Sequence, residues 1–177
     1  ALHNEDMTRA ERLIRMIDAM GIRYPYYTLD KADYFIAIGK KEEAKAIALE
    51  LADMETYRND APIQMRCGEV LWRVGEKQKA YVSLCQSLVL DDENYIGNKY
   101  AALYEMEHGE LKNALHHIYA AEMLREDEEV NKAVIGLERQ FIALCGKDAE
   151  TLEAEDARLL GYAYRYQGEL DKAIAVI

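Results

Sequence analysis

The sequence predicts an all-α fold in which antiparallel helix pairs stack into one superhelical domain. Two observations predict it: a short motif returns four times along the 177 residues, and apolar residues recur at helical spacing between its copies. No stretch alternates with period two for long enough to suggest a sheet, and the two prolines leave room for long helical runs. Each repeat can bury its apolar face only against its neighbours, so we expect the copies to stack.

The repeated motif is a Gly, four largely charged or polar residues and an Ala. Its copies are Gly39–Ala44, Gly75–Ala80, Gly109–Ala114 and Gly168–Ala173, and the Gly spacings are 36, 34 and 59. Gly adopts a positive φ at little cost, so each Gly is predicted to end one helix and reverse the chain. Another small residue stands seven positions before each Gly and lets the two helices approach closely: Ala32, Gly68, Ala102 and Gly161.

The predicted elements begin with a helix over 8–20. Thr8 opens it, with Glu11 in capping-box spacing, and Gly21 closes it. Helix pairs follow at 25–38 with 41–55, at 61–74 with 77–90, and at 95–108 with 111–125.

The C-terminal part of the chain is less regular. A helix is predicted over 129–145, and the segment 147–153 is too short for a normal partner helix. The last pair begins near Glu155 and is cut off at Ile177, so we interpret the chain as a piece of a longer protein. The repeats are therefore expected at 25–58, 61–94, 95–128, 129–153 (irregular) and 154–177, within one domain over 1–177.

Composition excludes several classes of function. The chain carries 22 Lys and Arg against 33 Asp and Glu, a net charge of −11, which argues against sequence-independent binding to nucleic acid or to anionic membranes. No apolar run approaches the roughly 20 residues of a membrane span. The three cysteines form no CxxC pair and lie in apolar stretches, and no signal peptide is visible. We therefore expect buried thiols in a reducing, cytoplasmic compartment.

The histidines give little support for catalysis or metal binding. Glu105 and His108 have the spacing of half a di-iron carboxylate site, but a second Glu-x-x-His is absent from the sequence. His116 and His117 are adjacent, so on a helix they point about 100° apart. The sequence also has no Gly-rich phosphate loop and no nucleophile elbow. We expect no enzyme activity, no metal and no cofactor.

The repeat motif resembles the tetratricopeptide repeat, a helix–turn–helix unit of about 34 residues, over most of 25–177. In the last repeat, the residues standing where this family places Leu, Gly, Tyr, Gly and Ala are Leu160, Gly161, Tyr164, Gly168 and Ala173. The family's early Trp is replaced by Thr28, Gln64, Asn98 and Ala157, and Glu105 stands at a usually apolar position. The resemblance implies a right-handed superhelical solenoid.

The same resemblance implies that the first helix of each pair lines a concave groove. Residues spaced i, i+4 and i+7 on these helices are expected to face the groove, together with Arg73, which lies beside one such stripe. The predicted groove residues are Asp33, Met65, Glu69, Trp72, Arg73, Lys99, Leu103, Met106, Arg158, Tyr162 and Arg165. The alternative is that some of them are core, since solenoid helices bury two faces. Arrays that clamp a C-terminal carboxylate place Asn where this chain has Asp33, Glu69 and Leu103, so we do not expect that mode of binding.

Our first hypothesis is a scaffold that binds a peptide or helix of another protein in this groove, without catalysis. The alternative from the structural class is self-association through Ile174, Val176 and Ile177. A third hypothesis is a regulatory or chaperone module of a larger protein. It draws on a loose resemblance to bacterial secretion chaperones at Gly109, Glu110, Leu111 and Ala121.

Overall fold

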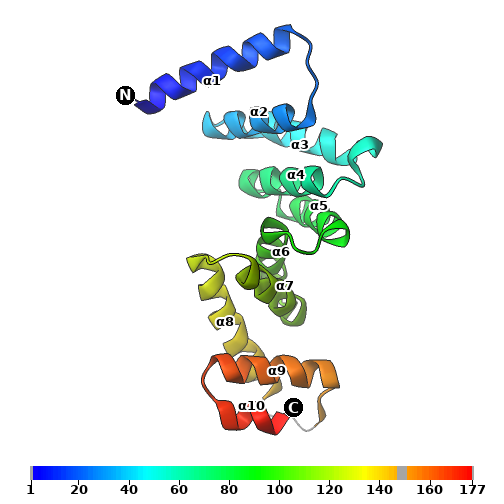
Figure 1. The fold of residues 1–177 in the computed structure, drawn as a ribbon, viewed down its shortest axis with the longest axis vertical. Coiled ribbons are helices and arrows are strands. Elements are labelled where there is room, and N and C mark those ends of the chain that lie inside the picture. The colour runs from blue at the N-terminus through cyan, green and yellow to red at the C-terminus, as the bar shows by residue number, and fades with distance from the viewer. Residues whose placement is uncertain (1, 147–150, 177) are drawn as a thin grey trace. The chain divides into compact units, whose positions relative to one another are not determined.

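The computed structural model describes residues 2–146 and 151–176, and every regular element in these ranges is helical (Figure 1). The α-helices are α1 (Leu2–Ala19), α2 (Pro25–Ala37), α3 (Lys41–Asp53), α4 (Ala61–Val74), α5 (Lys77–Leu90), α6 (Tyr95–Glu107), α7 (Leu111–Leu124), α8 (Glu128–Cys145), α9 (Ala154–Tyr166) and α10 (Leu170–Val176). A short 3-10 helix, η1 (Glu55–Tyr57), follows α3. The predicted all-α fold is confirmed.

The helices form two compact units, Ala1–Leu90 (unit 1) and Asp91–Ile177 (unit 2). In unit 1, α2 packs on α3, α3 on α4 and α4 on α5, and α2 also contacts α4. In unit 2, α6 packs on α7, α7 on α8, α8 on α9 and α9 on α10. Each helix contacts mainly its neighbours in the chain, as expected for a repeat solenoid. One continuous domain over 1–177 stays a prediction.

The four motif glycines end their helices in the predicted way. Gly39, Gly75, Gly109 and Gly168 all have positive φ, between 77° and 96°. The residue after each Gly donates its amide to the carbonyl five positions back, for example Glu76 N to Leu71 O at 2.9 Å. This bond satisfies a carbonyl that the helix end would otherwise leave unpaired.

The small residues of the motif lie where two helices approach most closely. A Cβ atom added at Gly68 would lie 2.6 Å from Leu84 Cγ, closer than real side chains come, so only Gly lets α4 approach α5 this tightly. Ala32 and Ala102, its equivalents in the neighbouring pairs, are also buried.

The start of the first helix differs from the sequence prediction. Helix α1 begins at Leu2, so Thr8 and Glu11 lie inside it and do not form its N-cap. No Gly or Pro precedes Thr8, so nothing in the sequence stops the helix there. In the irregular segment 147–153, residues 147–150 lie outside the described residues, and α9 begins at Ala154.

Three helix starts, those of α4, α6 and α8, use side-chain caps. Asp60 accepts a hydrogen bond from Ile63 N at 3.0 Å, and Asn94 accepts one from Gly97 N at 2.9 Å. Asp127 accepts hydrogen bonds from Glu129 N and Val130 N at the start of α8.

Within the described ranges, no helix combines the length and the apolar character that crossing a membrane requires.

Candidate partner-binding site

Helix α4 presents Met65, Glu69 and Trp72 on one side. All three are half-buried and lie opposite the side that carries the buried Cys67 and Leu71. Residues four and seven positions apart share a helix face, which explains why the predicted stripe is continuous. The structure therefore brings three of the predicted residues together on one outward face.

A cluster of ion pairs joins this face to α2. Arg66 lies at its centre, with Nη2 2.6 Å from Asp33 Oδ2 and Nη1 2.7 Å from Glu69 Oε2. Arg73 pairs with the other oxygen of Asp33. Burial alone would lower the pKa of Arg66, but its hydrogen bonds to Asp33 and Glu69 raise it. Asp30 also lies 3.6 Å from Arg66 Nη2, so the cluster pairs two arginines with three carboxylates and leaves Asp33, Glu69 and Arg73 all engaged.

Arg66 was not among the predicted site residues, although a signal for it exists. It precedes Glu69 by three positions, a spacing at which oppositely charged residues meet on a helix. Its reach to Asp33, 33 positions away, follows only from the packing of α2 against α4.

Trp72 lies on the same face of α4 as Glu69, beside this cluster. The Lys77 ammonium lies 5.0 Å from the centre of the indole ring, within the range of a cation–π interaction. Part of the indole and of Met65 is accessible to solvent. An aromatic and a flexible thioether side chain thus flank a fixed polar cluster.

On α6, the predicted Lys99 has a structural role. It is only 8% exposed, and its ammonium lies 2.9 Å from Asp127 and 2.7 Å from Glu129. Tyr95 also donates a 2.5 Å hydrogen bond to Asp127, and these contacts hold the pKa of that carboxyl below its usual range. Lys99 therefore joins α6 to the start of α8 and is not a rim residue open to a partner.

The two apolar residues predicted on α6 differ in surroundings. Both are half-buried, and Met106 packs against the hydrophobic core of unit 2. Burial of Met106 agrees with the alternative that part of this stripe is core.

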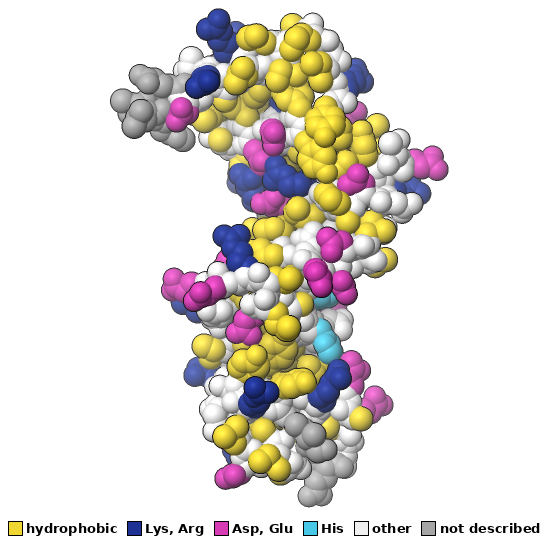
Figure 2. Space-filling model, in the orientation of Figure 1, with side chains coloured by type: hydrophobic (Ala, Val, Ile, Leu, Met, Phe, Trp, Pro, Cys, Tyr) yellow, Lys and Arg dark blue, Asp and Glu magenta, His cyan; other side chains and the backbone are white. Residues whose placement is uncertain are grey.

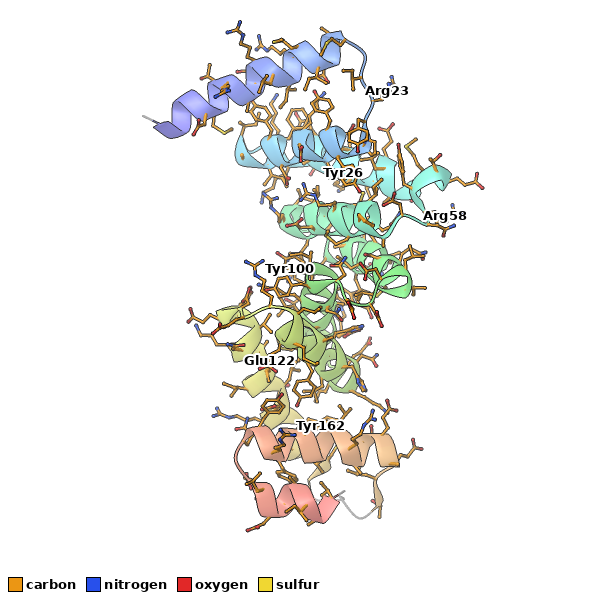
Figure 3. The ribbon with its side chains drawn as sticks, in the orientation of Figure 1. Arg23, Tyr26, Arg58, Tyr100, Glu122 and Tyr162 are labelled. Atoms are coloured by element: carbon orange, nitrogen blue, oxygen red, sulfur yellow. The ribbon has the colours of Figure 1, made fainter. Side chains whose placement is uncertain are left out.

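Helix α9 exposes all three of its predicted residues. Arg158, Tyr162 and Arg165 lie on one face, with Tyr162 labelled in Figure 3. Beside them, Tyr166 stacks on Tyr119 of α7 with ring centres 5.6 Å apart. In Figure 2, Lys and Arg side chains and hydrophobic side chains lie together over α9.

Unit 2 also buries two carboxylates that belong to no predicted site. Glu105 contacts His117 Nδ1 at 2.8 Å, and Glu138 accepts hydrogen bonds from Tyr119 at 3.0 Å and Gln167 at 2.6 Å. Burial raises the pKa of Glu138. The Glu105–His108 pair considered from spacing does not form, because the His108 ring contacts the carbonyl of Tyr104.

These polar groups do not converge on a metal. Among the described residues, no group of three or more His, Cys, Asp or Glu is arranged to hold one. The described cysteines form no disulfide, and burial raises the pKa of Cys67 to about 12, which keeps it protonated and unreactive.

Neither a family model nor a curated protein matches this sequence. Solved structures do match. A crystal structure of MamA aligns with a TM-score of 0.54 and 16% identity over 98% of this chain and 86% of that one. YrrB, described as a TPR protein with an unusual peptide-binding site, aligns with a TM-score of 0.52 and 18% identity over 84% of this chain and 80% of that one. At these identities the likeness concerns the fold, and it agrees with the repeat motif and its turns: the chain has the tetratricopeptide-repeat fold.

Proposed function

We propose that this chain is a protein-interaction scaffold that binds a peptide or helix of a partner on the outward faces of its first helices. One observation carries the proposal: each unit leaves a large aromatic residue partly accessible on such a face with an arginine next to it, Trp72 beside the Asp33-paired Arg73 in unit 1 and Tyr162 beside Arg165 in unit 2. Trp, Tyr and Arg are the residues that most often dominate binding energy at protein interfaces.

The surroundings of Trp72 support this function. The ion pairs of Arg66 hold α2 and α4 together before any partner arrives, so little ordering is left for the binding step. Met65 offers an adaptable apolar surface next to this fixed cluster. YrrB, which shares the fold, is described as having a peptide-binding site, and this also favours peptide binding here.

The polar groups favour binding over chemistry. In the described ranges, the buried carboxylates Glu105 and Glu138 bond to neighbouring side chains, and Lys99 bridges two acids. Each therefore has a stabilising contact that accounts for its burial. We propose that the chain has no catalytic activity of its own and needs no cofactor.

Site-specific photo-crosslinking tests the proposal. Benzoylphenylalanine is placed at Met65 in unit 1 or at Tyr162 in unit 2, and the matched control is Val82 on α5, a second helix, where the side chain is 65% exposed. After irradiation in a lysate, the first two positions should each yield the same discrete cross-linked protein, which is identified by mass spectrometry. The proposal fails if Val82 yields that protein as strongly as Met65 and Tyr162, or if neither position yields one.

A second candidate function is self-association through α1. Leu13, Met16 and Met20 share one face of this helix and are 48%, 53% and 61% exposed, which is unusual for a stripe of large apolar residues. Of the residues considered for self-association from the sequence, Ile174 is exposed, Val176 packs against the core of unit 2, and Ile177 lies outside the described residues. Light scattering across a hundredfold concentration range decides: a wild-type dimer that Met16→Glu converts to a monomer supports self-association, and a wild-type monomer throughout refutes it.

A further inference from the structure

The proposed scaffold function leaves the partner open, and α9 gives a reason to choose one. Unit 2 is rich in acids, with 19 Asp and Glu against 9 Lys and Arg. Its described lysines are all used in ion pairs: Lys99, Lys112, Lys132 and Lys172. The arginines of unit 2 differ: within 91–146 and 151–176 no carboxylate lies within 4.0 Å of Arg125, Arg139, Arg158 or Arg165, and of these four Arg158 and Arg165 share one helix face.

The nearest acids on the same helix are already engaged. Glu155 and Asp156 lie 3.0 and 2.8 Å from Lys112 of α7. Asp156 is on the side of α9 opposite the two arginines, whereas Glu155 is on their side of the helix and is engaged by Lys112. Glu122, labelled on α7 in Figure 3, is half-buried. The pKa of Tyr119 is raised mainly by burial and then by the negative charges of Glu138 and Glu122. Two guanidinium groups on one face of α9 thus have no ion pair with a described acid, although unit 2 as a whole is negatively charged.

Their spacing defines what they can hold. Residues seven positions apart on a helix lie on one face, about 10 Å apart along the axis. Tyr162, between them, presents an exposed ring, and the stacked rings of Tyr166 and Tyr119 extend the aromatic surface towards α7. A partner helix with two acids at the same spacing and an apolar residue between them presents matching groups to all three side chains.

We infer that this face of α9 binds an acidic amphipathic helix of a partner protein. Arg158 and Arg165 each pair with one carboxylate of that helix, and Tyr162 contacts the apolar residue between them. The inference rests on the proposed scaffold function and names its partner class. It assigns charge selectivity to unit 2, because the arginines on the corresponding face of unit 1 already bond to Asp33 and Glu69.

Fluorescence anisotropy with two synthetic peptides tests this inference. The first is a fluorescein-labelled helix of Ala and Gln with two Glu seven residues apart and Leu midway, and the second carries Lys in place of both Glu. The wild-type chain should bind the Glu peptide at least tenfold more tightly than the Lys peptide, and the preference should weaken as salt screens the pairs. Equal binding of the two peptides, or no binding of either, overturns the inference.

Charge reversal supplies the matched control. The double variant Arg158→Glu, Arg165→Glu should lose at least tenfold in affinity for the Glu peptide and prefer the Lys peptide. Arg139→Glu changes an exposed arginine of α8 outside this face and should leave both affinities within twofold. Retention of the helical circular dichroism and of the melting temperature excludes unfolding. If the Arg139 variant loses as much as the double variant, the effect is net charge alone and the inference fails.

The photo-crosslinking experiment separates this inference from the function on which it rests. A partner that cross-links at Tyr162 equally well with and without the charge reversal keeps the scaffold function and rejects acidic selectivity. The absence of cross-linking at every first-helix position rejects both. A partner lost specifically on charge reversal supports both.

Discussion

The two units share one repeat motif and differ in how they treat charge. Unit 1 is close to neutral, with 13 Lys and Arg and 14 Asp and Glu, whereas unit 2 carries almost all of the excess negative charge. In unit 1 the buried polar side chains are neutral: Gln64, Ser83 and Ser87. In unit 2 the buried polar side chains include three ionisable ones: Lys99, Glu105 and Glu138.

The outward faces show the opposite arrangement. In unit 1 the arginines of α4 are closed by ion pairs with Asp33 and Glu69, while in unit 2 the arginines of α9 are open. The same helix pairing therefore supports a face whose arginines are held in ion pairs in one unit and a face whose arginines are open in the other. The difference teaches that the repeat fixes backbone geometry, whereas the use of charge is set unit by unit.

The largest expected effect concerns the helix packing on which each unit depends. Gly68→Val should destabilise by about 3 kcal/mol, because its side chain would overlap Leu84 in the tight α4–α5 contact. Gly136, in the middle of α8 in unit 2, has no atom within 4 Å of an added Cβ, so Gly136→Ala should stabilise by about 0.5–1 kcal/mol through helix propensity. Urea unfolding measures the change in the free energy of unfolding for both variants. Changes of the same sign would mean that the distances from Gly68 and Gly136 to their neighbours are wrong.

Removal of the cationic centre of each unit's ion-pair cluster should give the next effect. Lys99→Met in unit 2 should cost about 1–3 kcal/mol, because the lysine is nearly buried and holds Asp127 and Glu129. Arg66→Met in unit 1 should cost less, because its side chain is 23% exposed and water can replace part of its bonding. The comparison between the units fails if urea unfolding ranks the two variants the other way round.

Trp72→Ala should affect binding more than stability. We expect at least a tenfold loss of affinity for the partner identified by cross-linking, with the melting temperature lowered by only a few degrees, since the indole is half-buried. Calorimetry of binding and thermal unfolding measure the two effects, and Val82→Ala on α5 is the control. A collapse of the melting temperature would place Trp72 in the core.

The smallest effect is a pH dependence that belongs to unit 2. Burial raises the pKa of Glu138 above its ordinary value of 4.5. Between pH 4.5 and the raised pKa, the folded chain therefore holds a proton that the unfolded chain has released. Its contribution to stability is therefore full below pH 4.5 and is lost as the pH rises through the raised pKa. Glu138→Gln should remove this loss, so the stability of the wild type relative to the variant should fall as the pH rises above 4.5.

Asp127 provides a test of opposite sign in the same titration. Its hydrogen bonds with Tyr95 and Lys99 lower its pKa below the ordinary 3.8, so its contribution is present above that pH and is lost as the pH falls. Both the wild type and Glu138→Gln should therefore lose stability in acid. If the difference between the two proteins does not change with pH, Glu138 is not held in the protonated form by burial.

The repeat itself could be predicted because its signals are local. Gly75 and its equivalents need a positive φ, and the apolar spacing between them fixes which side of each helix is buried. The beginning of α1 was missed, because Thr8 and Glu11 imitate a cap inside a helix that continues upstream. Local spacing cannot distinguish a true N-cap from the same Thr and Glu inside a longer helix when no helix-breaking residue intervenes.

The sequence by itself determined the helix pairs and their turns, and it predicted that Met65 and Trp72 share one helix face while leaving open whether that face is groove or core. Only the tertiary structure decided which charged side chains on such faces are engaged. Arg66 meets Asp33 across 33 positions and Lys99 meets Asp127 across 28, whereas Arg158 and Arg165 meet no described acid. The physical reason is that an ion pair forms only where helix packing brings two side chains within about 4 Å, and no periodicity along the chain encodes that distance.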